Sequence, residues 1–395
     1  MTTDFENLLH LLSCSALQRV PSPERDYNFE EIYRLSLKQQ VHTLVFPVIE
    51  EMKASGLYDI SDRVFDSWKN RYVYSVVFAE QRRDYMSGLF KKLESDGISY
   101  CVLKGEALSH LYPRPESRIS SDVDLWIENK DDMHKVAEYL REDGFNVGKT
   151  DPKSHQTECK HQKFGLIELH SDISDGVAKK IWFEDKISFK ESFIKVKDQA
   201  GSEFYTLSVT DGAIFVTFHF IKHFLSHGCG CRQLLDMLLY LKAHEDEIDF
   251  DKYNSVFTEL HYMKFINICK AIGKKYMDTD LADVPDSDDE ICREVLSDIE
   301  SGGVFGQDEE FRKSFTGYYT KKRNSGDAGQ KKVMISSFRK RAESFLRNRN
   351  YNPVRIVCDL LRISKNRNTE NNTSLINKRL EMFEDLGFFE GNSDK

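Results

Sequence analysis

The stretch LKGEALSHLYPRPESRISSDVDLWIE, residues 103–128, decides the fold of this chain. Near its end, Asp122 and Asp124 flank a single apolar residue. Successive side chains of an extended strand alternate between two faces, so both carboxylates are expected on the same face. The residues around them, VDLWI at 123–127, are mostly branched or aromatic, as in a partly buried strand. The stretch therefore predicts a strand with two neighbouring carboxylates, an arrangement that suits Mg²⁺, which prefers oxygen ligands and often shares them with phosphates.

A strand, a tight turn and a helix start are expected just upstream. The apolar run ISYCVL, residues 98–103, ends at Lys104 and Gly105, and a helix-like segment follows from Glu106 to His110. A glycine at such a turn lets the backbone approach a ligand closely, and a helix N-terminus offers free N–H groups to a phosphate. Lys104 adds a positive charge. The turn is therefore a candidate phosphate-binding element.

This order of strand, glycine turn, helix and Asp-x-Asp strand resembles the nucleotidyltransferase superfamily related to DNA polymerase β. More narrowly, it resembles the bacterial uncharacterised nucleotidyltransferase family, with a looser likeness to the nucleotidyltransferase toxins of abortive-infection systems. The matching residues are Lys104, Gly105, Ala107, Leu108, Tyr112, Pro113, Arg118, Ser120 and Asp122 to Leu125. The resemblance implies an α+β fold in which a polymerase-β-like core, a small mixed sheet with helices, is flanked by N- and C-terminal helical domains.

The resemblance also implies a third carboxylate on a later strand, and Glu168 in LIELH, residues 166–170, stands in that place. Glu168 alternates with Ile167 and Leu169 and therefore faces away from them. If its strand neighbours the Asp-x-Asp strand, Glu168 joins the two aspartates. The alternative is a solvent-facing glutamate of the sheet. With the upstream motif, we predict that Asp122, Asp124 and Glu168 are the catalytic residues and the ligands of Mg²⁺, or of Mn²⁺ in its place.

The family pattern implies phosphate contacts as well. Gly105 and Ser120 shape the turn and the strand entry, while Lys104 and Arg118 meet phosphate oxygens. One departure concerns Glu106, which occupies the position of a usually small residue. An acidic side chain there is expected to repel a triphosphate, so that removing its charge should not weaken nucleotide binding.

A helical pattern from Asp211 to His244 places His219, His223 and His227 four residues apart, followed by Cys229 and Cys231. Such a stripe suggests zinc, but the Cys-x-Cys spacing differs from the Cys-x₂₋₄-Cys pattern of structural zinc sites. The HxxKH sequence, followed by Arg and LLD, also resembles the second motif block of the family, in which a helix packs beside the nucleotide. Lys222 and Arg232 are therefore candidate nucleotide contacts, and the alternative for each is a solvated cation on a helix.

Length and composition define the general class of the protein. At 395 residues the chain exceeds what one hydrophobic core usually holds. We predict an N-terminal helical region (1–97), a nucleotidyltransferase core (98–205) and a C-terminal helical domain (206–395). No apolar run reaches the roughly 18 to 20 residues of a bilayer span, the acidic N-terminus is not a secretory signal, and the eight cysteines are scattered. These features predict a cytoplasmic protein without a membrane partner.

Charge is distributed unevenly along the chain. The net charge of -9 argues against wholesale nucleic-acid binding. Residues 321–367, however, contain fourteen Lys or Arg against three acidic residues. This basic segment either faces a polyanion such as a tRNA or a triphosphate, or is a solvated helix surface that pairs with the acid-rich residues 278–310.

The reaction that the resemblance implies is Mg²⁺-dependent transfer of a nucleoside monophosphate from an NTP to an acceptor hydroxyl, with pyrophosphate released. One alternative is a catalytically degenerate protein that binds a nucleotide as a sensor, for which Glu106 is the supporting feature. Another is a toxin-like enzyme that modifies tRNA, for which the basic segment is the supporting feature. The sequence leaves open the acceptor (small molecule, protein or RNA), the preferred NTP and the oligomeric state.

Overall fold

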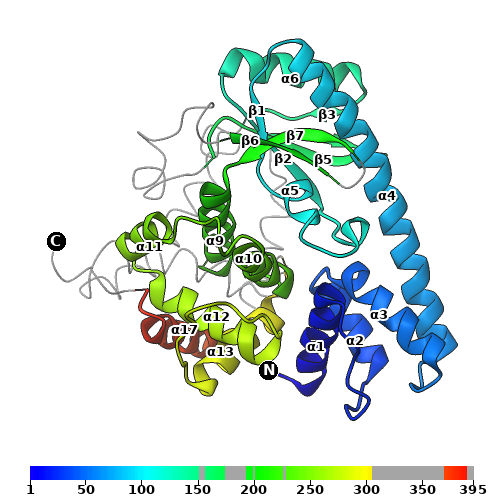
Figure 1. Cartoon of the computed structure of the whole chain (residues 1–395), viewed down its shortest axis with the longest axis vertical. Helices are drawn as coiled ribbons and strands as arrows, with labels where there is room; N and C mark the ends of the chain where they lie inside the picture. Colours follow the sequence, from blue (N-terminus) through cyan, green and yellow to red (C-terminus); the bar gives the residue numbers. More distant parts are fainter. Residues whose placement is uncertain (151–155, 174–192, 199–200, 226–227, 305–368, 389–395) are drawn as a thin grey trace, which may run out of the picture.

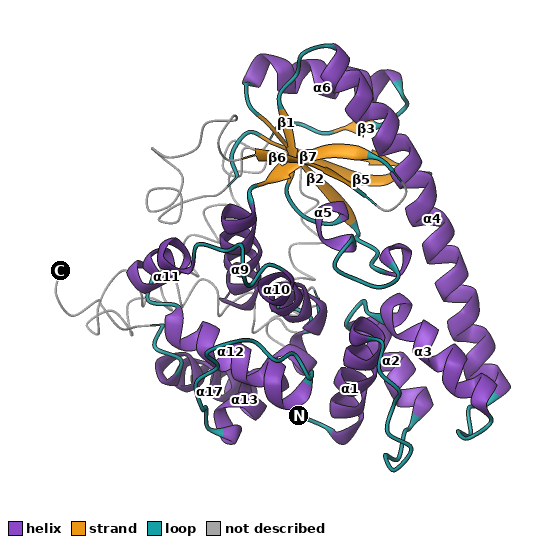
Figure 2. Ribbon diagram, in the orientation of Figure 1, coloured by secondary structure: helices purple, strands orange, loops and turns teal. Residues whose placement is uncertain are grey.

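A computed structural model describes residues 1–150, 156–173, 193–198, 201–225, 228–304 and 369–388 (Figures 1 and 2). His227 and the basic segment 321–367 lie outside these residues. A sheet lies at one end of the molecule and most of the helices at the other, and the long helix α4 (Asp62–Ser95) connects the two ends (Figure 1). In the described part of the chain, no helix has the length and apolar character needed to cross a membrane.

The sheet has seven strands in the order β3-β4-β5-β2-β1-β7-β6. Strand β2 pairs in parallel with β5, and β1 in parallel with β7, whereas the remaining pairs are antiparallel. The chain therefore has the mixed sheet and the α+β class that the sequence predicts. The strands are β1 (Tyr100–Val102), β2 (Asp122–Ile127), β3 (Asn146–Val147), β4 (Gln156–His161), β5 (Gly165–His170), β6 (Phe193–Lys197) and β7 (Glu203–Leu207).

One face of the sheet is covered by the end of α4 and by α6 (Lys130–Glu142) (Figure 2). Alternate apolar side chains of β2 and β5 point into this layer, because a strand turns every second residue to the same side. Their burial leaves the polar residues of both strands on the opposite face. The buried layer contains Val123, Leu125 and Ile127 of β2, Ile167 and Leu169 of β5, Met86, Leu89, Phe90 and Leu93 of α4, and Met133, Val136 and Leu140 of α6.

The N-terminal region is helical, and a short break separates its second and third helices. Helix α2 ends at Lys38, and Gln40 adopts a left-handed φ of 52° before α3 begins at His42. Ser61 caps α4 by accepting a hydrogen bond from the backbone N–H of Val64. The helices are α1 (Thr3–Leu17), α2 (Phe29–Lys38), α3 (His42–Ser55) and the 34-residue α4.

The C-terminal region also begins with helices, and the helical pattern expected between Asp211 and His244 forms two of them. Helices α9 and α10 are separate, and Gly228, with a φ of 110°, and Gly230 lie between them. The described helices of this region are α9 (Val209–Leu225), α10 (Cys231–Ala243), α11 (Phe250–Glu259), α12 (Met263–Tyr276), α13 (Asp289–Gly302) and α17 (Thr369–Asp385).

Candidate functional site

The parallel pairing of β2 with β5 brings the three predicted carboxylates to one face of the sheet. In the register of this pair Asp124 lies directly opposite Glu168. Asp122 is two residues before Asp124 on β2 and shares its face. The strand of Glu168 therefore neighbours the Asp-x-Asp strand. From the sequence, this pairing was required for Glu168 to join the two aspartates.

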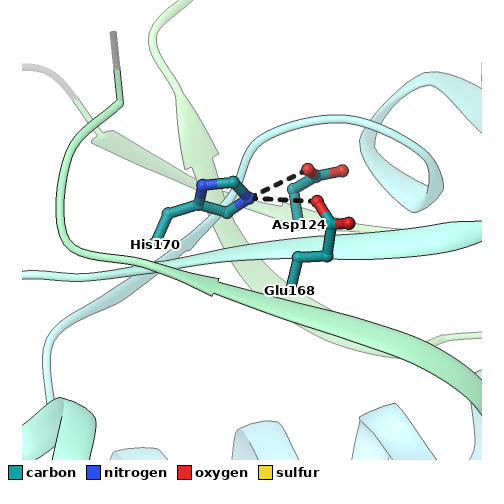
Figure 3. A group of neighbouring side chains, drawn as sticks. All are labelled: Asp124, Glu168 and His170. Atoms are coloured by element: carbon teal, nitrogen blue, oxygen red, sulfur yellow. Dashed lines mark hydrogen bonds and ion pairs between the residues drawn. The ribbon is translucent and has the colours of Figure 1, made fainter. Parts of the chain in front are cut away.

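Two basic side chains alternate with these carboxylates. Lys104 Nζ lies 3.3 Å from an oxygen of Asp122 and 3.1 Å from Oδ2 of Asp124. On the other side, His170 Nε2 lies 3.0 Å from Oδ1 of Asp124 and 3.6 Å from Oε2 of Glu168 (Figure 3). Alternation of opposite charges offsets the repulsion that three neighbouring carboxylates would otherwise experience.

His170 is a site residue that the sequence reasoning missed. It lies two residues after Glu168 on β5, so strand periodicity alone places both side chains on the same face. The two-residue spacing of Glu168 and His170 in LIELH, residues 166–170, indicates this shared face from the sequence alone. The same argument that paired Asp122 with Asp124 would have added His170 to the site.

The electrostatic environment favours the charged forms of Asp122, Lys104 and His170. Burial opposes ionisation of Asp122, but Lys104 and a hydrogen bond from Ser121 outweigh it and lower the pKa of Asp122 to about 2. Burial likewise opposes the charge of Lys104, and the adjacent Asp124 and Asp122 outweigh it and raise the pKa of Lys104. For His170, burial is outweighed by hydrogen bonds to Asp124 and Glu168, which raise its pKa to about 9.

The donor atoms at the site fit a divalent cation. One ligand atom each from Asp124, Glu168 and His170 lies within 4.8 Å of the other two. Asp124 is only 4 % exposed, and its Oδ2 atom is buried and accepts no hydrogen bond of ordinary geometry, although Lys104 is its ion-pair neighbour. Carboxylate oxygens are suitable ligands for Mg²⁺ and Mn²⁺.

The histidine and cysteine residues of the α9–α10 region do not form such a group in the described part of the chain. Asp124, Glu168 and His170 are the only group of three metal-binding side chains found there. Cys229 and Cys231 are buried cysteines. Within the described residues, the structure thus places the candidate metal ligands on the sheet.

The turn before helix α5 (Glu106–Ser109) has the conformation that requires glycine. Gly105 has a φ of 70°, and a Cβ at this position would lie 3.5 Å from the Cβ and Oγ atoms of Ser120. Ser120 Oγ in turn donates a hydrogen bond to Asp122 at 3.3 Å. Gly105 and Ser120 therefore lie next to each other beside Asp122, and their role in shaping the turn and the strand entry stays a prediction. Helix α5 (Glu106–Ser109) is only one turn long, so the structure does not support a phosphate site at its N-terminus.

Glu106 contacts arginines of α4. Its carboxylate lies 3.7 Å from Arg82 Nη2 and 3.4 Å from Arg83 Nε. Arg82 is fully buried and also donates a hydrogen bond of 2.9 Å from Nη1 to the backbone carbonyl of Ser120. The negative charge of Glu106 is thus compensated within the fold. There is therefore no reason to expect Glu106 to repel a triphosphate.

We expect Glu106→Gln to lower the free energy of unfolding by about 1–3 kcal/mol, the usual effect of leaving a buried charged partner unsatisfied. The reason is that Arg82 would remain buried with only the carbonyl of Ser120 as a strong partner. Urea denaturation followed by circular dichroism measures the change. Glu80→Gln is the control, because Glu80 pairs with Arg83 but its side chain is 44 % exposed. Equal stability of Glu106→Gln and the parent would contradict this role.

Arg118, a predicted phosphate contact, forms a buried bidentate ion pair with Asp236 of α10. Arg118 Nε lies 3.2 Å from Oδ1 and Nη2 lies 2.6 Å from Oδ2 of Asp236. The hydroxyl of Tyr112 donates a third hydrogen bond to Oδ1 at 2.8 Å. Only Nη1 of Arg118, a buried nitrogen without a hydrogen-bond partner, remains for a ligand. The guanidinium therefore holds the loop before β2 against α10.

A small pocket lies beside Asp122, between the turn and helices α9 and α10. Its volume is about 70 Å³, far below the roughly 300–1,000 Å³ of pockets for whole small molecules. It therefore suits a single phosphate-sized group better than a nucleoside. Its charged and polar lining includes Lys104, Arg118, Ser120, Asp122, His219 and Arg232.

Two predicted nucleotide contacts differ in their relation to this pocket. Arg232 lines it, is buried, and donates a hydrogen bond of 2.8 Å to the carbonyl of Ile119. Burial, together with the nearby positive charge of Arg118, lowers the pKa of Arg232. Lys222 is exposed on α9 and does not line the pocket. The structure thus brings Lys104, Gly105, Ser120, Arg118 and Arg232 together, and leaves Lys222 outside.

Comparison with known proteins gives a matching family and several distantly similar solved structures, two of which are named below. The model of a family described as "Uncharacterised nucleotidyltransferase" matches residues 25–275, a range that includes the whole site described above. No curated protein matches the chain. The lincosamide antibiotic adenylyltransferase LnuA, solved with lincomycin bound, is 14% identical over 41% of this chain and 95% of its own, with a TM-score of 0.30. An antigenic nucleotidyltransferase-like protein from Paracoccidioides brasiliensis is 13% identical over 51% of this chain and 94% of its own, with a TM-score of 0.34.

Proposed function

We propose a reaction for this chain because it belongs to the uncharacterised nucleotidyltransferase family, which makes it an enzyme of that class. In this reaction it transfers a nucleoside monophosphate from an NTP to an acceptor hydroxyl, and the transfer depends on Mg²⁺. The observation that supports this most strongly is the register of β2 and β5. It puts Glu168 opposite Asp124 and on the face that Asp122 also shares. These three carboxylates are the proposed catalytic residues.

Asp122, Asp124 and Glu168 would hold Mg²⁺, or Mn²⁺ in its place, through their carboxylate oxygens. When bound, such an ion neutralises the charge that develops on the phosphate oxygens and orients the reacting groups. Lys104, which lies between the two aspartates, would turn toward a phosphate when a cation takes over its charge-compensating position. Its ammonium is a compact charge on a flexible stem, which suits such an exchange of partners.

The remaining residues would bind and orient the substrates. We propose that Ser120, Arg232 and the free Nη1 of Arg118 hold a phosphate of the NTP in the pocket beside Asp122, with Gly105 giving it room. Lys222, being exposed, would reach only an outer part of the nucleotide. In the reaction the acceptor oxygen bonds to the α-phosphorus, the bond from that phosphorus to pyrophosphate breaks, and Glu168 accepts the hydroxyl proton.

Other parts of the proposal rest on the sequence. We retain the division into residues 1–97, 98–205 and 206–395, and a cytoplasmic location on the basis of the scattered cysteines. The acceptor and the preferred NTP stay open, since the basic segment that suggested tRNA lies outside the described residues. The sensor alternative rested on Glu106, whose charge Arg82 and Arg83 compensate.

Incubation of the purified protein with each α-³²P-labelled NTP, a cell lysate and Mg²⁺ tests the proposal. We expect one NTP to label one fraction, protein, RNA or small molecules, and we expect a chelator of divalent cations to prevent the labelling. Calorimetry with ATP and GTP and an assay of pyrophosphate release accompany the experiment. Nucleotide binding with neither label transfer nor pyrophosphate release would identify a sensor instead.

A further inference from the structure

His170 lies beside Asp124 and Glu168, at one side of the carboxylate site, and has no role in the nucleotidyl transfer proposed above. Its Nε2 atom is close to both Asp124 and Glu168, and the three side chains converge from two neighbouring strands (Figure 3). We propose that His170 is itself a ligand of the divalent cation, and that its nitrogen makes the site prefer Mn²⁺ over Mg²⁺. The inference rests on the metal site of the proposed function and adds both a ligand and a metal preference to it.

The spacing of the donor atoms supports coordination. Adjacent ligands about 2.1 Å from one ion lie about 3.0–3.5 Å apart, depending on the coordination geometry. Nε2 of His170 is 3.0 Å from Oδ1 of Asp124 and 3.6 Å from Oε2 of Glu168. These two distances are close to the spacing of ligands around one ion, and one ligand atom from each of the three side chains lies within 4.8 Å of the other two.

The surroundings of Asp124 are a second indication of a cation site. Its side chain is almost fully buried, and its neighbours are two movable cations, Lys104 beside Oδ2 and His170 beside Oδ1. A buried carboxylate needs such positive neighbours, because desolvation of its charge is costly. A bound cation would satisfy the carboxylate and allow Lys104 to leave for a phosphate.

The identity of the donors determines the metal preference. Mg²⁺ is a hard ion that favours oxygen ligands and water, whereas imidazole nitrogen suits transition metals. Replacing one oxygen donor by a nitrogen therefore weakens the relative affinity for Mg²⁺. Coordination uses the lone pair of Nε2, so the hydrogen that Nε2 shares with Asp124 passes to solvent when the ion binds.

Metal titration of the full-length protein, without nucleotide or acceptor, tests this inference. Mn²⁺ and Mg²⁺ affinities are measured by calorimetry for the parent, for His170→Gln and for His134→Gln, the control on the exposed side of α6. We expect His170→Gln to weaken Mn²⁺ binding at least about tenfold, and to weaken Mg²⁺ binding less. His134→Gln should change neither affinity.

A spectroscopic measurement on the unmutated protein does not depend on the folding of the variant. Electron spin echo envelope modulation of bound Mn²⁺ should show coupling to a ¹⁴N nucleus. Equal weakening of both metals by His170→Gln, or bound Mn²⁺ without nitrogen coupling, would show that His170 only pairs with the carboxylates and would overturn the inference. That result would leave the proposed transfer intact, whereas nitrogen-coupled Mn²⁺ without label transfer would overturn the proposed function alone.

Discussion

Asp124→Asn is expected to lower nucleotidyl transfer by a hundredfold or more, about the effect of removing one group that stabilises charge in a transition state. The substitution keeps the shape of the side chain and removes its formal charge. Asp124 is the carboxylate that contacts both Lys104 and His170 and lies opposite Glu168. Loss of the Asp124 charge would therefore weaken the binding of the metal and the positioning of Lys104 and His170 together.

Label transfer from an α-³²P-labelled NTP and the melting temperature with and without Mg²⁺ or Mn²⁺ measure this effect. A cation that binds only the folded protein stabilises it by mass action, so the variant should lose the metal-dependent rise in melting temperature along with activity. Glu128→Gln is the matched control, because Glu128 is an exposed carboxylate immediately after β2. Retention of transfer within a few-fold by Asp124→Asn would rule out the three-carboxylate site.

Asp236→Ala is expected to lower the free energy of unfolding by about 3–5 kcal/mol, the usual cost of removing one partner of a buried ion pair. Asp236 accepts hydrogen bonds from Arg118 and from Tyr112, and all three residues are buried. Without the carboxylate, the charge of Arg118 stays buried near the charge of Arg232. These two like charges repel each other, and no counter-charge from Asp236 remains to offset the repulsion.

Urea denaturation followed by circular dichroism measures this loss. The control is Glu138→Ala, which removes a carboxylate from an exposed ion pair with Arg141 and should leave the stability almost unchanged. The double variant Arg118→Met with Asp236→Leu should recover much of the stability, because apolar residues often replace a buried pair at little cost. A change of less than about 1 kcal/mol in Asp236→Ala would contradict a structural role for the pair.

The two predictions separate the functions of neighbouring residues in one motif. Asp124 is proposed to take part in the chemistry, and we expect its replacement by Asn to leave the fold in place. Arg118 belongs to the same sequence motif, but its bonds to Asp236 give it mainly a structural task. A motif read from sequence does not distinguish these tasks, since both residues match the family pattern equally well.

Local periodicity allowed a large part of the site to be predicted from sequence. The two-residue repeat of a strand places Asp122 with Asp124, and Glu168 with His170, whatever the rest of the chain does. The glycine after the apolar run 98–103 predicted a tight turn, and in the structure it has a φ of 70°. These features depend on residues close together in the chain, so the sequence alone determines them, although the pairing of His170 with Glu168 was missed.

The tertiary structure decided which strands are neighbours and which charges pair. The parallel pairing of β2 with β5 joins the two halves of the site, and the contacts of Glu106 with Arg82 and of Arg118 with Asp236 link residues 24 and 118 positions apart. The chain has 56 basic and 65 acidic residues, and no local pattern specifies which of them meet. Packing of α4 and α10 against the core selects these partners, because a buried charge is tolerated only where the fold supplies its counter-charge.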